Sequence, residues 1–230
     1  MWVKVCANTS LEDAQLAASA GADAVGFVFA ESVRRVTAEQ VRAITPHLPE
    51  AIEKYGVFVD AGVEEIRATI KECGLTGVQL HTSLDPALPQ KLRDRFPAAG
   101  GRSRLGIIRV IHYGGDLSER LLEAERDEAI DAVLVDSRTA TLLGGTGRRF
   151  DWQHARENLT RATGLHLVVA GGLNPENVAE AIETLRPWGV DVASGVEASP
   201  GRKDPAKVRA FIRNARIAAN KAKLGVEVEA

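Results

Sequence analysis

The chain has 230 residues, with 29 lysines and arginines against 31 aspartates and glutamates, and 45% of its residues are hydrophobic. A formal charge of -2 gives no polybasic surface for nucleic acid or for an anionic membrane. No apolar run approaches the roughly 20 residues that span a bilayer, and the N-terminal residues lack the pattern of a secretion signal. These features predict a cytoplasmic globular protein whose partner is a small molecule, with no nucleic-acid or membrane partner.

The two cysteines, Cys6 and Cys73, are too few for a disulfide framework. The histidines are scattered without the His/Glu or His/Asp spacing that builds a metal site. The sequence therefore favours chemistry that uses no metal.

Short apolar segments recur along the chain, and each is followed by a longer segment whose apolar residues have helical spacing. This alternation indicates parallel strands joined by helices. One segment, Val25–Phe29, is apolar at nearly every position, which is typical of a strand covered on both faces. We expect eight strands, at residues 2–7, 24–30, 55–60, 77–82, 105–112, 132–137, 166–172 and 189–196.

Several of the intervening helices have recognisable N-terminal caps. Ser10 is a capping residue type ahead of one helix, and Thr37 with Gln40 forms a capping box ahead of the next. Asp204 is expected to cap the last helix.

Other signals mark where helices stop. One helix is expected to open at Asn174 and Pro175 and to end before Pro187. Glycine followed two residues later by aspartate occurs at Gly21–Asp23 and Gly189–Asp191. We interpret both as helix stops and chain reversals without a catalytic role.

Eight strands, each followed by a helix, are the expected content of a single-domain α/β protein with the (β/α)8 TIM barrel fold. A doubly wound open sheet is the alternative, but it usually carries a Gly-x-Gly-x-x-Gly turn after the first strand, and residues 6–10 contain none. We expect one barrel domain at residues 1–220 and a frayed tail at 221–230.

In a barrel of this kind the active site lies at the C-terminal ends of the strands. Asp136 closes an apolar strand and needs either a polar partner or a site, so a functional role is favoured. Cys6 ends the first strand and, taken alone, is more often a small buried core residue than a base. His81 ends the fourth strand and is as readily a structural hydrogen-bonding residue as a ligand contact.

Glycine-rich turns follow the last three strands. Glycine allows the backbone to approach a ligand closely, and barrels often hold phosphate at the loops after strands seven and eight. The cluster at 144–147 lies in an unusually long connection beside two arginines, which suggests a mobile lid or a flexible solvated loop. The residues expected to bind phosphate are Gly144, Gly145, Gly171, Gly172, Ser194 and Gly195.

Eight parts of the sequence form a specific pattern in order and spacing, at residues 21–29, 32–36, 56–59, 78–81, 144–147 with 150–152, 171–178, 191–197 and 200–204. Together they resemble the phosphoribosylanthranilate isomerase family over nearly the whole chain. The resemblance implies an Amadori rearrangement of a phosphoribosyl anthranilate in tryptophan biosynthesis, without cofactor, by a monomer or homodimer. It implies Cys6 as general base and Asp136 as general acid. It also aligns Arg35 with an arginine that faces the anthranilate carboxylate, and His81 with a substrate-binding histidine.

The chain departs from the family pattern at two positions beside the expected site. Ala7 and Thr82 stand where the family usually has glycine. We expect these changes to affect the conformation of the loops and the turnover rate more than the type of reaction.

Two other functions remain open. One is the related phosphosugar isomerase of histidine biosynthesis, although that family resembles a doubled half-barrel with an aspartate base on the first strand. The other is a catalytically silent phosphosugar-binding barrel. The presence of both Cys6 and Asp136 argues against the second alternative.

Overall fold

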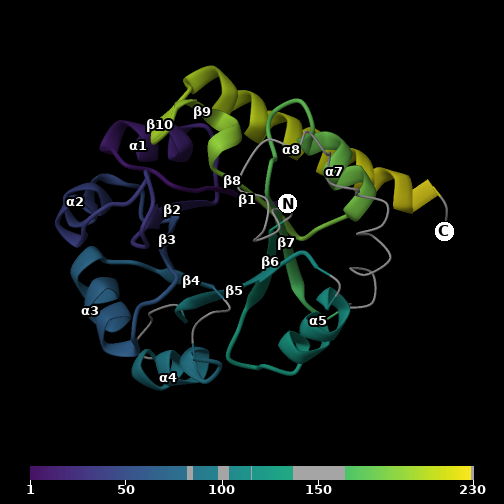
Figure 1. Cartoon of the computed structure of the whole chain (residues 1–230). Helices are drawn as coiled ribbons and strands as arrows, with labels where there is room; N and C mark the ends of the chain where they lie inside the picture. The colour runs from purple at the N-terminus through teal and green to yellow at the C-terminus, as the bar shows by residue number, and fades with distance from the viewer. Residues whose placement is uncertain (82–84, 98–103, 115, 137–163, 229–230) are drawn as a thin grey trace.

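A computed structural model describes residues 1–81, 85–97, 104–114, 116–136 and 164–228, with side chains up to residue 222. Eight parallel strands pair in sequence order, and the first pairs with the eighth to close a barrel (Figure 1). The strands are β1 (Trp2–Val5), β2 (Ala24–Val28), β3 (Glu53–Phe58), β4 (Gly77–His81), β5 (Gly106–His112), β6 (Ala132–Asp136), β7 (His166–Ala170) and β8 (Gly189–Val192). All eight predicted strands are confirmed, most of them shorter than expected.

Helices surround the ring of strands in Figure 1. They are α1 (Leu11–Ser19), α2 (Ala38–Ile44), the short 3-10 helix η1 (Thr45–His47), α3 (Val63–Cys73), α4 (Leu88–Arg95), α5 (Leu117–Glu125), α7 (Val178–Leu185) and α8 (Pro205–Val228). The predicted connection with the glycine cluster at 144–147 and the helix expected near residue 151 lie outside the described residues. The arrangement confirms the predicted (β/α)8 barrel.

The core consists of two apolar layers, because successive side chains of a strand point to opposite faces. Outward-facing residues pack with the helices, as Val3, Val5 and Phe211 do. Inward-facing residues fill the barrel, with Trp2 and Tyr55 in edge-to-face contact near the N-terminal ends of their strands, at 5.9 Å between ring centroids. Both faces of each strand are therefore buried, which explains why the strands are nearly continuous in apolar residues.

The predicted helix caps are present. The Ser10 hydroxyl accepts from the backbone N–H of Asp13, and the reciprocal capping box between Thr37 and Gln40 is formed. The Asp204 carboxylate accepts from two backbone N–H groups in the first turn of α8. These local bonds satisfy N–H groups that a helix leaves without partners in its first turn.

Helix α8 extends as far as Val228, and the frayed tail expected at residues 221–230 stays a prediction. Two predictions about turns need correction. Helix α7 begins at Val178, because Asn174 instead forms a turn in which its side chain accepts from the N–H groups of Glu176 and Asn177. The segment Gly189–Asp191 is not a chain reversal but part of β8, which places the Asp191 side chain inside the barrel.

After β8 the chain forms a feature that the sequence did not reveal. A short 3-10 helix, η2 (Ser194–Val196), leads into an antiparallel pair of short strands, β9 (Glu197–Ser199) and β10 (Arg202–Lys203). This pair lies beside α1 in Figure 1. It brings Glu197 and Lys203 next to the C-terminal end of the barrel.

Candidate active site

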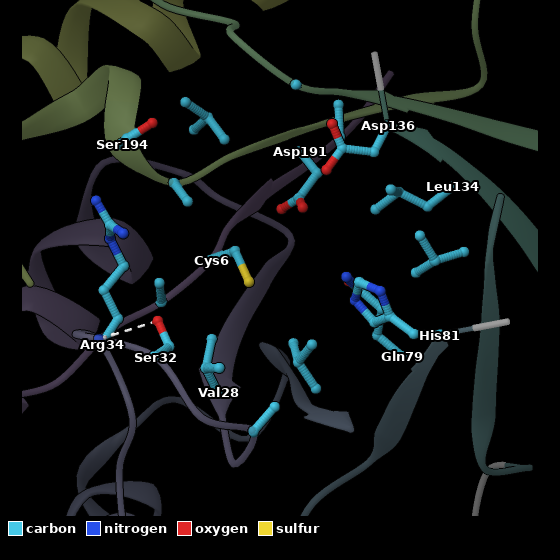
Figure 2. A pocket seen from close by; sticks show the side chains of 18 of the residues that line it. Cys6, Val28, Ser32, Arg34, Gln79, His81, Leu134, Asp136, Asp191 and Ser194 are labelled. Carbon is cyan, nitrogen blue, oxygen red and sulfur yellow. Dashed lines mark hydrogen bonds between the residues drawn. The ribbon is translucent and has the colours of Figure 1, made fainter. Parts of the chain in front are cut away.

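A cavity of about 270 Å³ opens at the C-terminal ends of the strands. Cys6 follows β1, Asp136 ends β6 and His81 ends β4, and all three line this cavity (Figure 2). Gly171, Gly172 and Ser194, from the loops after β7 and β8, line it as well. The topology therefore brings together residues that are up to 188 positions apart in sequence, as the barrel fold predicts.

Cys6 is buried, with 5% of its surface exposed, and is a free cysteine. The absence of a side chain at Gly26, on the neighbouring strand, leaves room for the Cys6 sulfur. A Cβ atom at Gly26 would lie 2.6 Å from that sulfur. Burial raises the pKa of the Cys6 thiol, and the nearby Lys4 ammonium opposes this shift. A thiol in this environment holds its proton at neutral pH until something favours the thiolate.

Ala7, at the position where the family resemblance predicts glycine, has a φ of 61°, in the left-handed region. Hydrogen bonds hold the chain on both sides of it. Cys6 N–H donates to the Val192 carbonyl at 2.8 Å, and Asn8 N–H donates to the Gly26 carbonyl at 2.9 Å. Alanine pays a steric penalty in this conformation that glycine avoids. The departure from the family pattern therefore has a definite consequence, a strained backbone beside Cys6.

Replacement of Ala7 by glycine is expected to increase the free energy of unfolding by about 1 kcal/mol, because it relieves this strain. Ala24→Gly is the matched control, since Ala24 is equally buried but lies in the ordinary extended backbone of β2. That variant should lose about 1 kcal/mol. Urea unfolding of both variants measures the difference, and an equal loss of stability in the two would contradict the strain at Ala7.

His81 is partly buried and faces His112, with 5.6 Å between the ring centroids. Burial, together with the neighbouring His112, lowers the pKa of His81 to about 4. The imidazole is therefore neutral at pH 7 and offers one N–H donor and one acceptor. This suits a hydrogen bond to substrate better than charge pairing. Thr82 lies outside the described residues.

The structure places Arg34, rather than Arg35, at the cavity. Arg34 lines it, whereas Arg35 is exposed and its backbone bridges to Val28 at the end of β2. Residues 32–35 form a turn that is closed by a hydrogen bond of 3.0 Å from Arg35 N–H to the Ser32 carbonyl, and Arg34 is the arginine of this turn that lines the cavity. Of the two arginines, Arg34 is therefore the one that lines the cavity, and the role that the resemblance implies for Arg35 stays a prediction.

Arg34 is held in place by the Glu197 carboxylate of β9. Its Nε and Nη2 atoms donate to the two carboxylate oxygens of Glu197 at 2.8 and 2.7 Å. Burial would raise the pKa of Glu197, but Arg34 and Lys203 hold it below its usual range. This two-point ion pair joins the loop after β2 to β9 and fixes the plane of the guanidinium.

The glycine turns after β7 and β8 pack against each other. Gly171 and Gly172 have φ values of 88° and 66°, conformations that favour glycine. A Cβ atom at Gly195 would lie 1.8 Å from the Leu173 carbonyl oxygen, so only glycine allows this approach. Gly195 is therefore needed for loop packing, and Ser194 beside it lines the cavity. Gly144 and Gly145 lie outside the described residues.

Sequence reasoning missed three polar residues inside the barrel. Lys4, Gln79 and Asp191 are all buried, and Gln79 and Asp191 line the cavity from below. In Figure 2, Asp191 and Asp136 are drawn in the upper part of the view, and Gln79 and His81 in its right-hand part. In the sequence, each of the three is a polar residue within an otherwise apolar strand. A strand position that faces solvent would give the same pattern, so the sequence does not show that these residues are buried.

Within the described parts of the chain, no three His, Cys, Asp or Glu side chains are arranged to hold a metal ion. No helix in the same residues has the length and apolarity required to cross a bilayer.

Comparison with known proteins connects this geometry to a family. A sequence model of N-(5′-phosphoribosyl)anthranilate (PRA) isomerase matches residues 3–214. The N-(5′-phosphoribosyl)anthranilate isomerase of Trichlorobacter lovleyi is 43% identical over 217 residues, which cover 94% of this chain and 98% of the relative. The corresponding protein of Rubrobacter xylanophilus is 44% identical over 217 residues, which cover 93% and 98%.

Solved structures agree in fold. The phosphoribosyl anthranilate isomerase of Thermotoga maritima has a TM-score of 0.80 at 37% identity, covering 94% of this chain and 98% of that one. A phosphoribosyl anthranilate isomerase in complex with reduced 1-(o-carboxyphenylamino)-1-deoxyribulose 5-phosphate has a TM-score of 0.77 at 35% identity, with the same coverage. The chain therefore belongs to the N-(5′-phosphoribosyl)anthranilate isomerase family.

Proposed function

We propose that this protein converts N-(5′-phosphoribosyl)anthranilate to 1-(2-carboxyphenylamino)-1-deoxyribulose 5-phosphate, the Amadori rearrangement of tryptophan biosynthesis. The observation that carries the proposal is that Cys6 and Asp136 line one cavity at the C-terminal end of the barrel in a member of this family. A thiol and a carboxyl on different strands provide a base and an acid that can reach different atoms of one substrate.

The rearrangement requires two proton transfers. Asp136 is proposed to protonate the ring oxygen of the furanose, so that the ring opens to an iminium. Cys6, as thiolate, is proposed to take the proton from C2 of the sugar, which moves the double bond from C=N into an enolamine. The enolamine then becomes the ketone product. Acid and base groups are sufficient for both transfers, so the proposed reaction uses no cofactor.

The direct test is an isomerase assay on purified protein with substrate generated in situ, because the substrate is short-lived. Formation of the aminoketose product at a rate proportional to enzyme concentration supports the proposal. Binding without turnover would instead identify a catalytically silent phosphosugar-binding barrel. Turnover of the aminoaldose of histidine biosynthesis in place of this substrate would point to the other isomerase.

We propose that backbone N–H groups of the loops after β7 and β8 hold the phosphate, with Gly171, Gly172 and Ser194 at the cavity wall and Gly195 packing the loops together. Positive φ values at Gly171 and Gly172, in the loop after β7, turn successive peptide groups, and concave backbone segments of this kind bind anions. Gly144 and Gly145 are proposed to join them from the loop after β6.

Inorganic phosphate is expected to compete with substrate, and Gly172→Ala should weaken this inhibition several-fold. A side chain at Gly172 meets nothing within 4 Å, so the expected effect comes from its left-handed backbone. Gly62→Ala is the matched control, because that position is equally open but has a φ of -76° in another loop. Equal inhibition constants for the two variants and the wild type would place the phosphate elsewhere.

We propose that Arg34 faces the anthranilate carboxylate, the role that the resemblance had assigned to Arg35. Glu197 accepts from Nε and Nη2, and the outer edge of the guanidinium, formed by Nη1 and the second Nη2 hydrogen, can still donate two parallel hydrogen bonds to a substrate carboxylate, which a lysine ammonium cannot do. His81 is proposed to contact the substrate as a neutral hydrogen-bonding group.

Arg34→Lys is expected to raise KM about tenfold or more, because a charged hydrogen bond contributes about 1.5 to 3 kcal/mol and the fork geometry is lost. Arg35→Lys tests the neighbouring position and should leave KM within about twofold of the wild type. Steady-state kinetics of both variants give the comparison. If only Arg35→Lys raised KM, Arg34 would be a structural residue.

The ligand is a small molecule, and the proposed one is a phosphosugar. We propose a monomer or a homodimer in the cytoplasm, without a nucleic-acid or membrane partner. The related isomerase of Thermotoga maritima is described as dimeric. Sedimentation of the purified protein determines the assembly.

A further inference from the structure

A lysine ammonium lies at the centre of the barrel, beneath the proposed catalytic cysteine. Lys4 is 0% exposed, and its Nζ atom donates to Asp191 Oδ1 at 2.9 Å and to Gln79 Oε1 at 2.8 Å. These partners come from β8 and β4, on different sides of the barrel interior. A buried ion pair costs desolvation energy that an apolar pair of similar volume would avoid. Because this ion pair lies directly under the cavity, we look for its role in the function of the site.

Lys4 and Cys6 occupy adjoining space. They are two residues apart along the same chain segment, so their side chains point into the barrel on the same side. The Cys6 sulfur and the Lys4 Cε atom lie 2.6 and 3.0 Å from the point where a Gly26 side chain would begin. Gly26 thus leaves room in which the ammonium-bearing chain and the sulfur can lie side by side.

Other charged groups also act on Cys6, but they are engaged elsewhere. Lys203 donates to the Ala193 carbonyl at 3.1 Å and pairs with Glu197 at 3.4 Å, and Arg34 forms its two-point pair with the same carboxylate. Asp191 disfavours a thiolate at Cys6. Among these groups, Lys4 gives the largest favourable effect on the thiolate, opposing the burial that raises the pKa of Cys6.

We propose that Lys4 is a positioning residue that stabilises the Cys6 thiolate, and that Asp191 and Gln79 hold its ammonium in place for this task. The proposal rests on the proposed role of Cys6 as base. It adds a residue that acts through Cys6 without touching the substrate, since Lys4 is not part of the cavity wall. Asp191 has two opposing effects, because it keeps Lys4 charged while its own charge disfavours the thiolate.

The test is the titration of the Cys6 thiol in the free protein, which needs no turnover. A Cys73→Ala background leaves Cys6 as the single thiol, because the chain has two cysteines. The pH dependence of thiolate absorbance and of alkylation by iodoacetamide then reports on Cys6 alone. In Lys4→Met the thiolate fraction at neutral pH should fall about tenfold or more, because an opposite charge at this range shifts a pKa by about 1 to 3 units.

Two further variants keep the test interpretable. Lys4→Met leaves the Asp191 carboxylate buried without its cation, so the double variant Lys4→Met/Asp191→Asn removes both charges and preserves the fold if the single variant does not. In this double variant the pKa of Cys6 should still be higher than in the Cys73→Ala background, but the increase should be smaller than in Lys4→Met alone. Lys54→Met is the matched control, because Lys54 is also buried but its ammonium donates to the Ile52 carbonyl at 3.0 Å, outside the barrel interior.

Kinetic measurements distinguish a role of Lys4 in positioning from a purely structural role. The proposal requires Lys4→Met to lower kcat at neutral pH by the same factor as the thiolate fraction, with KM within about twofold and partial recovery at higher pH. Unchanged titration of Cys6 in both Lys4 variants, with Lys54→Met also unchanged, would overturn it. The proposed function fails separately, if the wild-type protein shows no isomerase activity while its thiol titrates as described.

Discussion

Cys6→Ser is expected to reduce the single-turnover rate of isomerisation by about 10²- to 10⁴-fold, the range that general acid or base groups contribute. A serine hydroxyl fits the space beside Gly26, but it does not ionise in the accessible pH range and cannot serve as the base. The wild-type rate should also rise with pH above neutrality, since burial raises the pKa of the Cys6 thiol. The serine variant should lack that rise.

Single-turnover measurement is required because product release can hide a slow chemical step in kcat. Cys73→Ser is the control. Cys73 is buried outside the cavity, where its sulfur contacts the Ala38 carbonyl at 3.4 Å, so its replacement should leave the rate unchanged. Near wild-type turnover by folded Cys6→Ser would remove Cys6 from the reaction and, with it, the role proposed for Lys4.

The architecture could be predicted because its determinants are local. A strand covered by helices on one face and by the barrel interior on the other is apolar at most positions, as Val25–Phe29 is. The caps at Ser10 and Thr37 use bonds between residues three apart, which the sequence displays directly. Once the order of strands and helices is known, the barrel fold places the C-terminal ends of the strands together. Cys6 and Asp136 can then be predicted to lie at the same site because each is at such an end.

The buried polar network could not be predicted from local patterns. Lys4 and Asp191 are 187 positions apart, and each sits in an apolar strand where a charged residue would equally suit a solvent-facing position. Their pairing depends on closure of β1 against β8, which aligns the two residues in register. The glycine two residues before Asp191 also imitates a helix stop, so the sequence favours a turn at Gly189–Asp191 as well as a strand from residue 189.

The choice between Arg34 and Arg35 is ambiguous in the sequence for a related reason. The two residues have the same chemistry, and the turn that they share sets which of them lines the cavity. Glu197, the residue that fixes Arg34, belongs to a short antiparallel strand pair that no periodic pattern marks. The residue types alone therefore do not show which arginine lines the cavity. That is set by contacts between residues far apart in the sequence.

Asp136→Asn is expected to lose about 10²- to 10⁴-fold in single-turnover rate while KM changes by less than about threefold. Asparagine matches aspartate in shape and still forms hydrogen bonds at the end of β6, but it has no acidic proton to give to the ring oxygen. The fold should be preserved, since the substitution introduces no new volume. Equilibrium unfolding of the variant checks this directly.

Asp60→Asn is the matched control for Asp136→Asn. Asp60 follows β3 near the same end of the barrel, but it is exposed and is not among the residues lining the cavity. Its replacement should leave the single-turnover rate unchanged. If Asp136→Asn also retained a near wild-type rate, the acid would have to be another carboxyl of the cavity. Glu31 and Asp191 are the other carboxyls that line the cavity in the described residues, and because the ion pair with Lys4 favours the ionised form of Asp191, Glu31 would be the next candidate for the acid.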